Sequence, residues 1–208
     1  MSSPVDHVVD IWLFSSADNS RNARRKLRRN VLAEYLNIEP DNICFEKEAH
    51  GRPVLHLSHK ISLSFNESHS IDSYGIAVCR SARVGFDIET IRELSDISEW
   101  ADQACPKEEL SKCENLPPDQ FAAALLRQWV RREAILKAWG VGLTYNPRQI
   151  DLSTRRPDTN CRNASVSIEG MTAVFSDIES SADIIGAVAL QDNSRNFSIR
   201  YKTLNYRF

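Results

Sequence analysis

The sequence predicts an α+β fold, because helical and strand-like segments occur along the chain in blocks. An amphipathic helix near the N-terminus is followed by mostly sequential strands, which favours an antiparallel sheet, and a longer helix in the second half is again followed by strands. Each half therefore combines one principal helix with several strands. The 208 residues, 42% hydrophobic and 26% charged, are typical of a globular chain with one domain or two small ones.

The first half is expected to contain one helix and five strands. Residues 24–36 place Leu27, Val31 and Leu32 on one face, opposite a run of arginines, which is the spacing of an amphipathic helix. The sequence HGRP at residues 50–53 predicts a turn. Short β-branched and aromatic segments predict strands over residues 8–14, 43–48, 61–65, 73–79 and 83–89.

The second half is expected to begin with helices and to end with strands. Short helices over residues 97–104 and 106–113 precede a long helix, which begins at the sequence PPD (117–119) and ends at Gly140. Residues 155–162 are polar and contain a proline, so we expect an exposed loop there. Strands are predicted over residues 164–168, 171–175, 184–190 and 197–202.

Charge, cysteine content and hydropathy exclude several classes of protein. The net charge of −2 gives no global field for nucleic acid, and the five cysteines include no C-x-x-C pair that would suggest a disulfide framework or a zinc site. Asp6 and Asp10 interrupt the apolar run at the N-terminus, which argues against a signal peptide. No segment approaches the roughly 20 apolar residues of a membrane span. We therefore expect a cytoplasmic protein that binds neither nucleic acid nor membranes.

Positive charge is concentrated in residues 21–29 (RNARRKLRR), where all but three residues are cationic. Such a run can bind phosphates, nucleic acid or an acidic protein, but it is most often the solvent-exposed face of an amphipathic helix. The absence of interleaved aromatic and basic residues argues against a nucleic-acid module.

Two segments carry carboxylates in patterns that suit a metal ion. In the sequence VGFDIE, strand alternation places Asp87 and Glu89 on the same face. On the long helix, Trp129, Glu133 and Lys137 follow one another at intervals of four and share a face. Mg²⁺ accepts a few carboxylate oxygens and leaves its other positions for water and substrate phosphate. Alone, the D-x-E pattern is better explained by a solvated strand end, and the helix pattern does not distinguish a metal ligand from a stabilising Glu–Lys pair.

Two other segments contain candidate phosphate contacts. The polar sequence SFNESHS (64–70) follows an apolar segment and includes Ser68 and His69, although a lone histidine is more often structural. Arg52 stands beside Gly51 in the predicted turn, and a guanidinium binds oxyanions in a bidentate way. On the long helix, Arg131 is expected to be a solvated charge.

Taken in order, these segments resemble the 4′-phosphopantetheinyl transferase superfamily, specifically its Sfp type. That family has an Arg-rich first helix, then G-K-P, F-N-x-S-H-S and G-I/V-D-I/V-E, and about forty residues later W-x-x-K-E-x-x-x-K-x-x-G. The corresponding segments here are GRP (51–53), FNESHS (65–70), GFDIE (85–89) and WVRREAILKAWG (129–140). Any one of these motifs is weak, but four in order and at the family spacing make the resemblance specific. It extends from about residue 20 to residue 145.

The resemblance implies two similar α/β halves, each with an antiparallel sheet and a long helix, related by a pseudo-twofold axis. Residues 1–84 would form the half that binds the 3′-phosphate and adenosine of coenzyme A. Residues 85–208 would form the half with the metal ion and the catalytic groups. Coenzyme A would lie in the cleft between the halves.

The implied activity is that of a holo-(acyl-carrier-protein) synthase type phosphopantetheinyl transferase. Such an enzyme moves the 4′-phosphopantetheine arm of coenzyme A onto a serine of an apo acyl or peptidyl carrier protein and releases 3′,5′-ADP. The resemblance implies a role in fatty-acid or secondary-metabolite biosynthesis. Because both halves lie in one chain, we expect a monomer.

The resemblance also implies roles for individual residues. Asp87, Glu89 and Glu133 would hold Mg²⁺, or Mn²⁺ in its place, and Glu133 would in addition serve as the general base. Lys137 would contact the pyrophosphate or the pantetheine phosphate. The 3′-phosphate and adenosine would be held by Arg52, Ser68 and His69, with Arg21 or Arg25 assisting.

The chain departs from the family pattern at four positions. Arg52 and Arg132 replace lysines, Phe86 replaces a smaller aliphatic residue, and Glu67 places a negative charge inside the F-N-x-S-H-S segment. The departures at Glu67 and Arg132 motivate an alternative: a catalytically silent paralogue that binds a carrier protein or coenzyme A without transferring anything. The intact set of three acids and Lys137 argues against that alternative.

Overall fold

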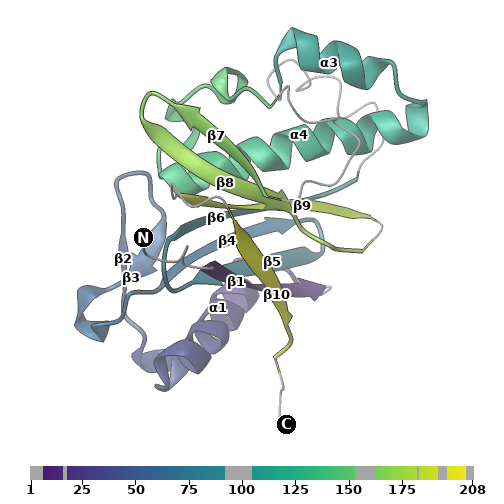
Figure 1. Cartoon of the computed structure of the whole chain (residues 1–208). Helices are drawn as coiled ribbons and strands as arrows, with labels where there is room; N and C mark the ends of the chain where they lie inside the picture. Colours follow the sequence, from purple (N-terminus) through teal and green to yellow (C-terminus); the bar gives the residue numbers. More distant parts are fainter. Residues whose placement is uncertain are drawn as a thin grey trace.

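The structure is a computed structural model and describes residues 7–15, 18–91, 105–152, 163–181, 183–191 and 196–204. Two four-stranded sheets lie at its centre, and one principal helix covers the outer face of each (Figure 1). The mixed helix and sheet content confirms the α+β class. The pseudo-twofold relation of two halves and the boundary between residues 84 and 85 stay predictions.

The first sheet has the strand order β10-β1-β5-β4. Its members are β1 (His7–Ser15), β4 (Ser64–Ser70), β5 (Ser73–Cys79) and β10 (Phe197–Lys202). The pairs β1–β5 and β4–β5 are antiparallel, as expected, but β1 and β10 run parallel. The expectation of a purely antiparallel sheet is therefore wrong for this half, because the last strand of the chain returns to pair with the first.

The second sheet has the order β6-β9-β8-β7 and is antiparallel throughout. Its strands are β6 (Arg83–Thr90), β7 (Ala164–Ile168), β8 (Met171–Asp177) and β9 (Ile184–Gln191). All four were predicted from the sequence, with boundaries that differ by at most two residues.

The molecule is layered in the order helix, sheet, sheet, helix (Figure 1). One buried cluster joins α1 (Arg21–Leu36) to the first sheet, and another joins α4 (Pro118–Trp139) to the second. A third lies between the two sheets and takes residues from both, including Ala77 of the first and Phe86 of the second. Both faces of the central strands are thus covered, which explains why every residue of β5 is buried.

Both principal helices end at the predicted residue, but α1 begins at Arg21, three residues before the predicted start at Arg24. Ser20 caps α1, since its Oγ accepts a hydrogen bond from the main-chain N–H of Ala23. Helix α4 has a proline in its first turn and ends at Gly140, whose φ of 74° is left-handed and whose N–H donates to the carbonyl of Leu136. The predicted stop at Gly140 is confirmed.

Smaller elements connect these layers. Strands β2 (Phe45–Lys47) and β3 (Pro53–Leu55) form a short hairpin, and α3 (Lys107–Glu114) packs beside α4. The 3₁₀ turns are η1 (Pro40–Asn42), η2 (Leu57–His59), η3 (Gly142–Thr144) and η4 (Pro147–Gln149). The predicted helix over 97–104 and the predicted loop over 155–162 lie outside the described residues.

One predicted strand is misplaced, and the error bears on the site. We expected a strand over residues 61–65 followed by a polar segment, whereas β4 begins at Ser64 and contains the whole FNESHS motif. The polar residues of β4 alternate along the strand, and those of one face hydrogen-bond the neighbouring strand β6. A polar strand of this kind has no apolar alternation in its sequence.

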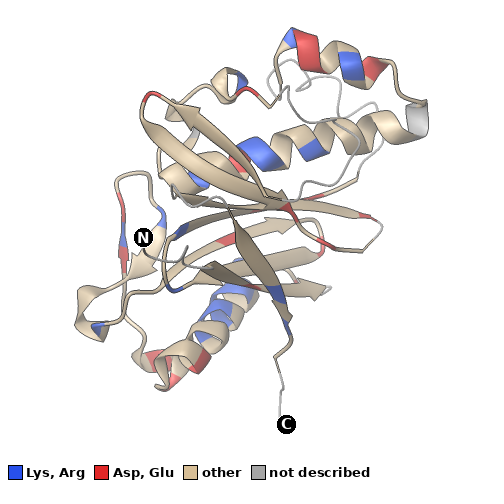
Figure 2. Ribbon diagram, in the orientation of Figure 1, with Lys and Arg blue, Asp and Glu red and all other residues tan. Residues whose placement is uncertain are grey.

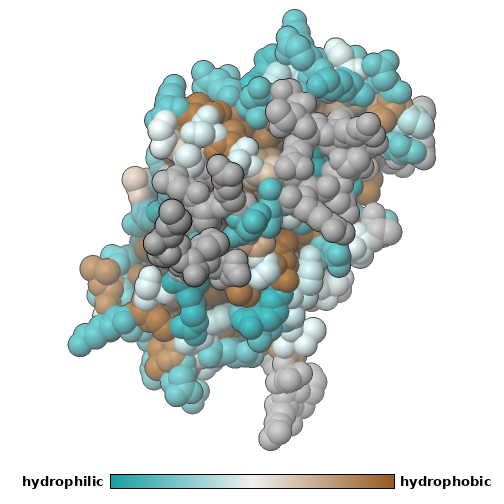
Figure 3. Space-filling model, in the orientation of Figure 1, coloured by the Kyte–Doolittle hydropathy of each residue, from teal (hydrophilic) through white to brown (hydrophobic). Residues whose placement is uncertain are grey.

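None of the described helices combines the length and apolar character that a membrane crossing requires. On the face shown in Figure 3, hydrophilic side chains cover α3.

Candidate active site

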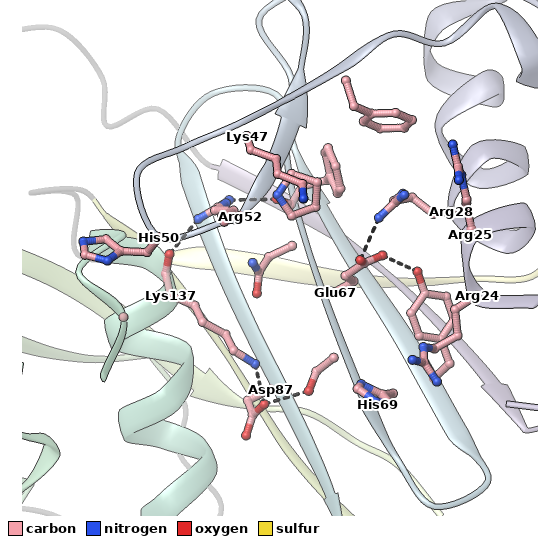
Figure 4. A pocket seen from close by; sticks show the side chains of 18 of the residues that line it. Arg24, Arg25, Arg28, Lys47, His50, Arg52, Glu67, His69, Asp87 and Lys137 are labelled. Carbon is pink, nitrogen blue, oxygen red and sulfur yellow. Dashed lines mark hydrogen bonds and ion pairs between the residues drawn. The ribbon is translucent and has the colours of Figure 1, made fainter. Parts of the chain in front are cut away.

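A cleft of about 1020 Å³ brings together residues from α1, the β2–β3 hairpin, β4, β6 and the C-terminal part of α4. Figure 4 shows the labelled α1 arginines on one side of this cleft, with Lys137 and Asp87 on the other. Every site residue predicted from the sequence lines it, namely Arg21, Arg25, Arg52, Ser68, His69, Asp87, Glu89, Glu133 and Lys137. The roles of these residues stay predictions.

Gly85 explains how β6 comes so close to α4. A Cβ atom at Gly85 would lie 2.0 Å from the carbonyl oxygen of Ala134 and 2.3 Å from the amide nitrogen of Ala138, distances that no side chain can occupy. Only glycine lets the strand rest directly on the helix backbone. The contact brings the D-x-E sequence of β6 beside the end of α4 that carries Glu133 and Lys137.

Lys137 forms an ion pair with one of these acids. Its Nζ donates to Oδ1 of Asp87 at 2.6 Å and to the carbonyl of Phe86 at 3.2 Å. Burial alone would lower the pKa of Lys137, but the charges of Asp87 and Glu133 and the hydrogen bond to Asp87 outweigh it and raise the pKa. Lys137 is therefore a fixed cation at neutral pH, not a proton acceptor.

Glu133 titrates near neutral pH. Burial raises the pKa of Glu133 to about 7, the charges of Asp87 and Glu89 add to the rise, and the charge of Lys137 opposes it. Oε1 of Glu133 and Oδ2 of Asp87 are both buried and have no hydrogen-bond partner among the described residues. Buried oxygens of this kind are costly unless a ligand or a proton satisfies them.

Two serines of β4 hold the acids of β6. Ser68 Oγ donates to Oδ1 of Asp87 at 2.7 Å, and Ser70 Oγ donates to Oε2 of Glu89 at 2.9 Å. The sequence did not identify Ser70 as a site residue. The feature that could have identified Ser70 is its position two residues after Ser68, because residues two apart on a strand lie on the same face.

The same face of β4 also bonds the backbone of β6. Each sheet ends there with an edge strand, and polar side chains of β4 satisfy main-chain N–H groups that no backbone partner reaches. Ser64 Oγ accepts a hydrogen bond from the N–H of Val84, Asn66 Oδ1 accepts one from the N–H of Phe86, and Ser70 Oγ accepts one from the N–H of Thr90. The motif FNESHS therefore joins the two sheets as well as lining the cleft.

The donor set fits a hard divalent cation in its chemistry. Asp87, Glu89 and Glu133 line one cleft and supply only carboxylate oxygens, the ligand type that Mg²⁺ prefers. Two of these oxygens are buried without a partner among the described residues. Within the described ranges, no three acidic, histidine or cysteine side chains are already gathered around one point. The carboxylates would have to move together around an ion, and the metal site stays a prediction.

Basic residues are concentrated on α1 (Figure 2), and its arginines divide into two groups by their contacts. Arg24, Arg28 and Arg29 already bond the protein: Arg24 bonds the carbonyl of Asn19, Arg28 pairs with Glu67, and Arg29 donates to the carbonyls of Pro40 and Ile43. Arg21 and Arg25 are exposed, and within the part of the chain that the structure describes neither has a hydrogen bond or an ion pair.

The negative charge of Glu67 is neutralised within the protein. One of its carboxylate oxygens accepts from Arg28 at 2.8 Å and the other from the hydroxyl of Tyr74. Near it, burial lowers the pKa of His69, and the charges of Arg24 and Lys137 lower it further, so the imidazole is neutral at pH 7. Glu67 therefore does not oppose an anion in the cleft.

Arg131 and Arg132 lie outside the cleft, and the expectation of a solvated Arg131 is wrong. Both side chains are fully buried. Arg131 donates to Asp177 through Nε at 2.8 Å and through Nη2 at 2.7 Å, and Arg132 donates to Glu109 at 2.6 Å. The two arginines attach α4 to the end of β8 and to α3, so the replacement of lysine by Arg132 does not alter the cleft.

Comparison with known proteins adds an independent line of evidence. The family model of the 4′-phosphopantetheinyl transferase superfamily matches residues 83–189, just over half of the chain. This range begins with β6 and contains Asp87, Glu89, Glu133 and Lys137.

Individual relatives match over a similar part of the chain. The 4′-phosphopantetheinyl transferase HetI of Nostoc sp. is 34% identical over 122 residues, which are 58% of this chain and 52% of HetI. The 4′-phosphopantetheinyl transferase AcpT of Salmonella typhimurium is 30% identical over 131 residues, 63% of this chain and 66% of AcpT. The L-aminoadipate-semialdehyde dehydrogenase-phosphopantetheinyl transferase of Xenopus laevis is 28% identical over 149 residues, 67% and 49% of the two chains. The chain thus spans about half to two thirds of the length of these relatives.

Proposed function

The chain belongs to the 4′-phosphopantetheinyl transferase superfamily, and on this premise we propose that it transfers the 4′-phosphopantetheine arm of coenzyme A to a serine of an apo acyl or peptidyl carrier protein. The second product is 3′,5′-ADP. We further propose that it is of the Sfp type, that it acts as a holo-(acyl-carrier-protein) synthase, and that it works as a cytoplasmic monomer.

The observation that carries the proposal is the division of charge within one cleft. At one end the cleft is lined by Asp87, Glu89, Glu133 and Lys137, and at the other by arginines of α1. A substrate with separate phosphate groups at the 3′ and 5′ positions of one ribose would place one anionic group at each end. Coenzyme A has this pattern, with a 3′-phosphate and a pyrophosphate.

At the basic end, we propose that Arg21 and Arg25 bind the 3′-phosphate. Both are exposed, line the cleft and have no partner among the described residues, so neither has to break a bond in order to bind. Ser68 and His69 line the same cleft. A neutral His69 can donate one hydrogen bond to the phosphate or the adenosine, and its other ring nitrogen can accept one from the adenosine.

At the acidic end, Asp87, Glu89 and Glu133 would hold Mg²⁺, or Mn²⁺ in its place. When bound, the ion would neutralise charge on the pyrophosphate and on the leaving 3′,5′-ADP. Lys137 would contact a pyrophosphate oxygen, since it is a cation 2.6 Å from Asp87. Ser68 and Ser70 would keep the carboxylates of Asp87 and Glu89 in orientation.

Glu133 is suited to take the proton of the carrier serine. Without a metal ion, burial raises the pKa of Glu133 to about 7. A divalent cation bound by the three carboxylates would lower this pKa and keep Glu133 ionised, as a proton acceptor must be. In the proposed step the serine oxygen forms a bond to the phosphorus that carries the pantetheine. The bond from that phosphorus to the oxygen of 3′,5′-ADP breaks, and the serine proton passes to Glu133.

Intact mass spectrometry tests this function. Several apo carrier proteins are incubated with the protein, coenzyme A and Mg²⁺, and each is weighed for the gain of one phosphopantetheine arm. We expect a gain that is absent with EDTA and absent with Glu133→Gln, while Glu34→Gln, an exposed glutamate on the outer surface of α1, behaves as the wild type.

The silent paralogue is the outcome that opposes the proposal. No gain on any carrier, together with measurable binding of coenzyme A, would favour a protein that binds without transferring. Transfer by Glu133→Gln at the wild-type rate would instead contradict the role of Glu133 alone.

A further inference from the structure

The guanidinium of Arg52 donates hydrogen bonds to main-chain carbonyls of three different elements. Nη1 donates to the carbonyl of Lys137 at 2.6 Å, and Nη2 donates to the carbonyls of Phe65 at 2.7 Å and Val84 at 2.8 Å. A longer contact of 3.3 Å reaches Oγ of Ser64. Figure 4 shows Arg52 beside Lys137, with dashed lines marking its hydrogen bonds.

The three carbonyls belong to the elements that carry the proposed chemistry. Phe65 lies in β4, which holds Ser68, and Val84 lies in β6, which holds Asp87. Lys137 lies in the last turn of α4. One side chain from the β2–β3 connection therefore ties together the strands and the helix whose relative positions determine the geometry of the acidic end.

The hydrogen bond from Arg52 to α4 satisfies a carbonyl at the C-terminal end of the helix. The last four carbonyls of a helix have no intrahelical donor, and a cation there interacts favourably with the helix dipole. Gly140 supplies an N–H to Leu136, and Arg52 supplies one to Lys137. Since Nζ of Lys137 contacts Asp87, this residue is held at both its backbone and its side-chain end.

The same bonds oppose a role for Arg52 as a phosphate ligand. Turning the guanidinium fork toward a phosphate would remove the donor from three carbonyls, and each unpaired buried carbonyl costs about 1–3 kcal/mol. Nε of Arg52 is buried and has no partner among the described residues, so it faces no open space. Burial, with the charge of Arg83 as the second cause, lowers the pKa of Arg52 to about 10, which leaves it charged at neutral pH.

We propose that Arg52 is a positioning residue, which fixes the C-terminal turn of α4 against β4 and β6 and so keeps Glu133 and Lys137 in reach of Asp87, instead of binding a phosphate of the substrate. The proposal rests on the proposed function and specifies how its site is assembled.

Replacing Arg52 with lysine separates the two roles. An ammonium group can bind a phosphate as a point charge, but it lacks the planar fork that reaches three carbonyls at once. For Arg52→Lys we expect kcat to fall about tenfold to a hundredfold, because small misplacements of reacting groups have effects of that size. The KM for coenzyme A and the Kd for adenosine 3′,5′-bisphosphate should change by less than about twofold, since Arg52 would contact neither.

Two control variants calibrate this result. Arg25→Ala removes a proposed phosphate contact and should weaken binding of adenosine 3′,5′-bisphosphate, whereas Arg80→Lys changes an exposed arginine outside the cleft and should leave all three quantities unchanged. Weaker binding of the bisphosphate by Arg52→Lys, with kcat preserved, would overturn the proposal. A wild-type kcat in Arg52→Lys would overturn it as well.

Two measurements do not depend on activity. In ligand-free protein, the amides of residues 134–140 should exchange hydrogen faster in Arg52→Lys than in the wild type, because the end of α4 has lost its anchor. In the wild type, the side-chain NMR signal of Arg52 should not move when adenosine 3′,5′-bisphosphate is added, while that of Arg21 or Arg25 should. Unchanged exchange, or a shift of Arg52 as large as that of Arg25, would contradict the proposal.

These measurements also keep the two proposals distinguishable. If the wild type transferred the arm to no carrier, the proposed function would fail, whereas exchange at the end of α4 would still test the anchor. If Arg52→Lys did not fold, the titration of the wild type would still decide whether Arg52 contacts the ligand.

Discussion

Nζ of Lys137 lies 2.6 Å from Oδ1 of Asp87, so one ion pair joins α4 to β6 across a separation of 50 positions in the sequence. The side chain of Asp87 is 7% exposed and that of Lys137 is 27% exposed, which makes the pair partly buried. A buried carboxylate that loses its cation is costly, whereas a pair in which both charges are removed is tolerated far better.

We therefore expect Lys137→Met to lower the free energy of unfolding by about 2 kcal/mol, since it leaves the buried carboxylate of Asp87 without its cation and with only the hydrogen bond from Ser68. Adding Asp87→Asn to this variant should restore part of the loss, because the uncompensated charge is then gone. Urea denaturation of the two single variants and the double variant measures the coupling. If the two single effects simply added, the ion pair would not be what stabilises this contact.

The raised pKa of Glu133 predicts a pH dependence of stability. The folded protein holds this proton up to about pH 7, whereas the unfolded chain releases it near pH 4.5. The contribution of Glu133 is therefore fully present below pH 4.5 and is lost as the pH rises through 7. Glu133→Gln removes the buried charge, so its advantage over the wild type should grow to about 3 kcal/mol between these pH values and then level off.

Urea denaturation at several pH values between 4 and 8 checks this prediction. Glu34→Gln, on the exposed surface of α1, is the matched control and should differ from the wild type by a constant amount. A pH-independent difference for Glu133→Gln would show that Glu133 has an ordinary pKa.

Gly85→Ala should separate β6 from α4. The new Cβ would lie 2.0 Å from the carbonyl of Ala134, and the backbone on both sides leaves it no room. We expect a loss of about 3 kcal/mol in the free energy of unfolding. Gly186→Ala meets only side-chain atoms of Ile178 and Ile88, at 2.7 Å and beyond, which can rotate away, so its loss should be smaller. Thermal unfolding ranks the two, and equal losses would contradict the close approach.

Ser70→Ala should weaken metal binding. The hydroxyl of Ser70 donates to Glu89 and accepts from the N–H of Thr90, and removing an orienting hydrogen bond of this type typically lowers metal affinity about tenfold to a hundredfold. Calorimetric titration with Mg²⁺ or Mn²⁺ measures the effect. Ser73→Ala, a buried serine in the next strand whose hydroxyl bonds Asp72, is the control. Equal affinities of the two variants would exclude an orienting role.

Arg21→Ala and Arg25→Ala should each weaken binding of coenzyme A about tenfold and reduce the dependence of affinity on salt, because each removes one charge-assisted contact to phosphate. Lys26→Ala removes a neighbouring charge that does not line the cleft and should leave the affinity unchanged. The affinities are measured by calorimetry at two salt concentrations. If Lys26→Ala matched the arginine variants, the effect would be one of overall charge.

Much of the fold could be predicted because it depends on local patterns. The strands over residues 73–79, 164–168 and 197–202 have the predicted boundaries, since each alternates or runs apolar between turn signals. Helix α4 ends at Gly140 for an equally local reason, the left-handed conformation of its C-cap. The motifs also identified residues that line one cleft, and the roles of these residues stay predictions.

The tertiary structure decided which partners the polar groups find. The sequence around Arg131 predicts a solvated charge on a helix. Arg131 is nevertheless buried, because β8 places Asp177, which is 46 positions away in the sequence, against it. Glu67 forms an ion pair with Arg28, and the FNESHS motif by itself does not indicate this partner. Likewise, β10 pairs with β1, at the opposite end of the chain, and so makes the first sheet mixed.

The sequence by itself determined the α+β class, the order of the principal helices and of most strands, and a set of candidate residues, because these depend on periodicity, turn chemistry and motif spacing within short stretches. Only the tertiary structure decided that Arg52 bonds three carbonyls, that Ser70 holds Glu89 and that Glu133 is buried beside two other acids. Periodicity shows which face of an element is apolar, but the environment of a polar side chain is set by elements far away in the chain, and that environment fixes its charge and its partners.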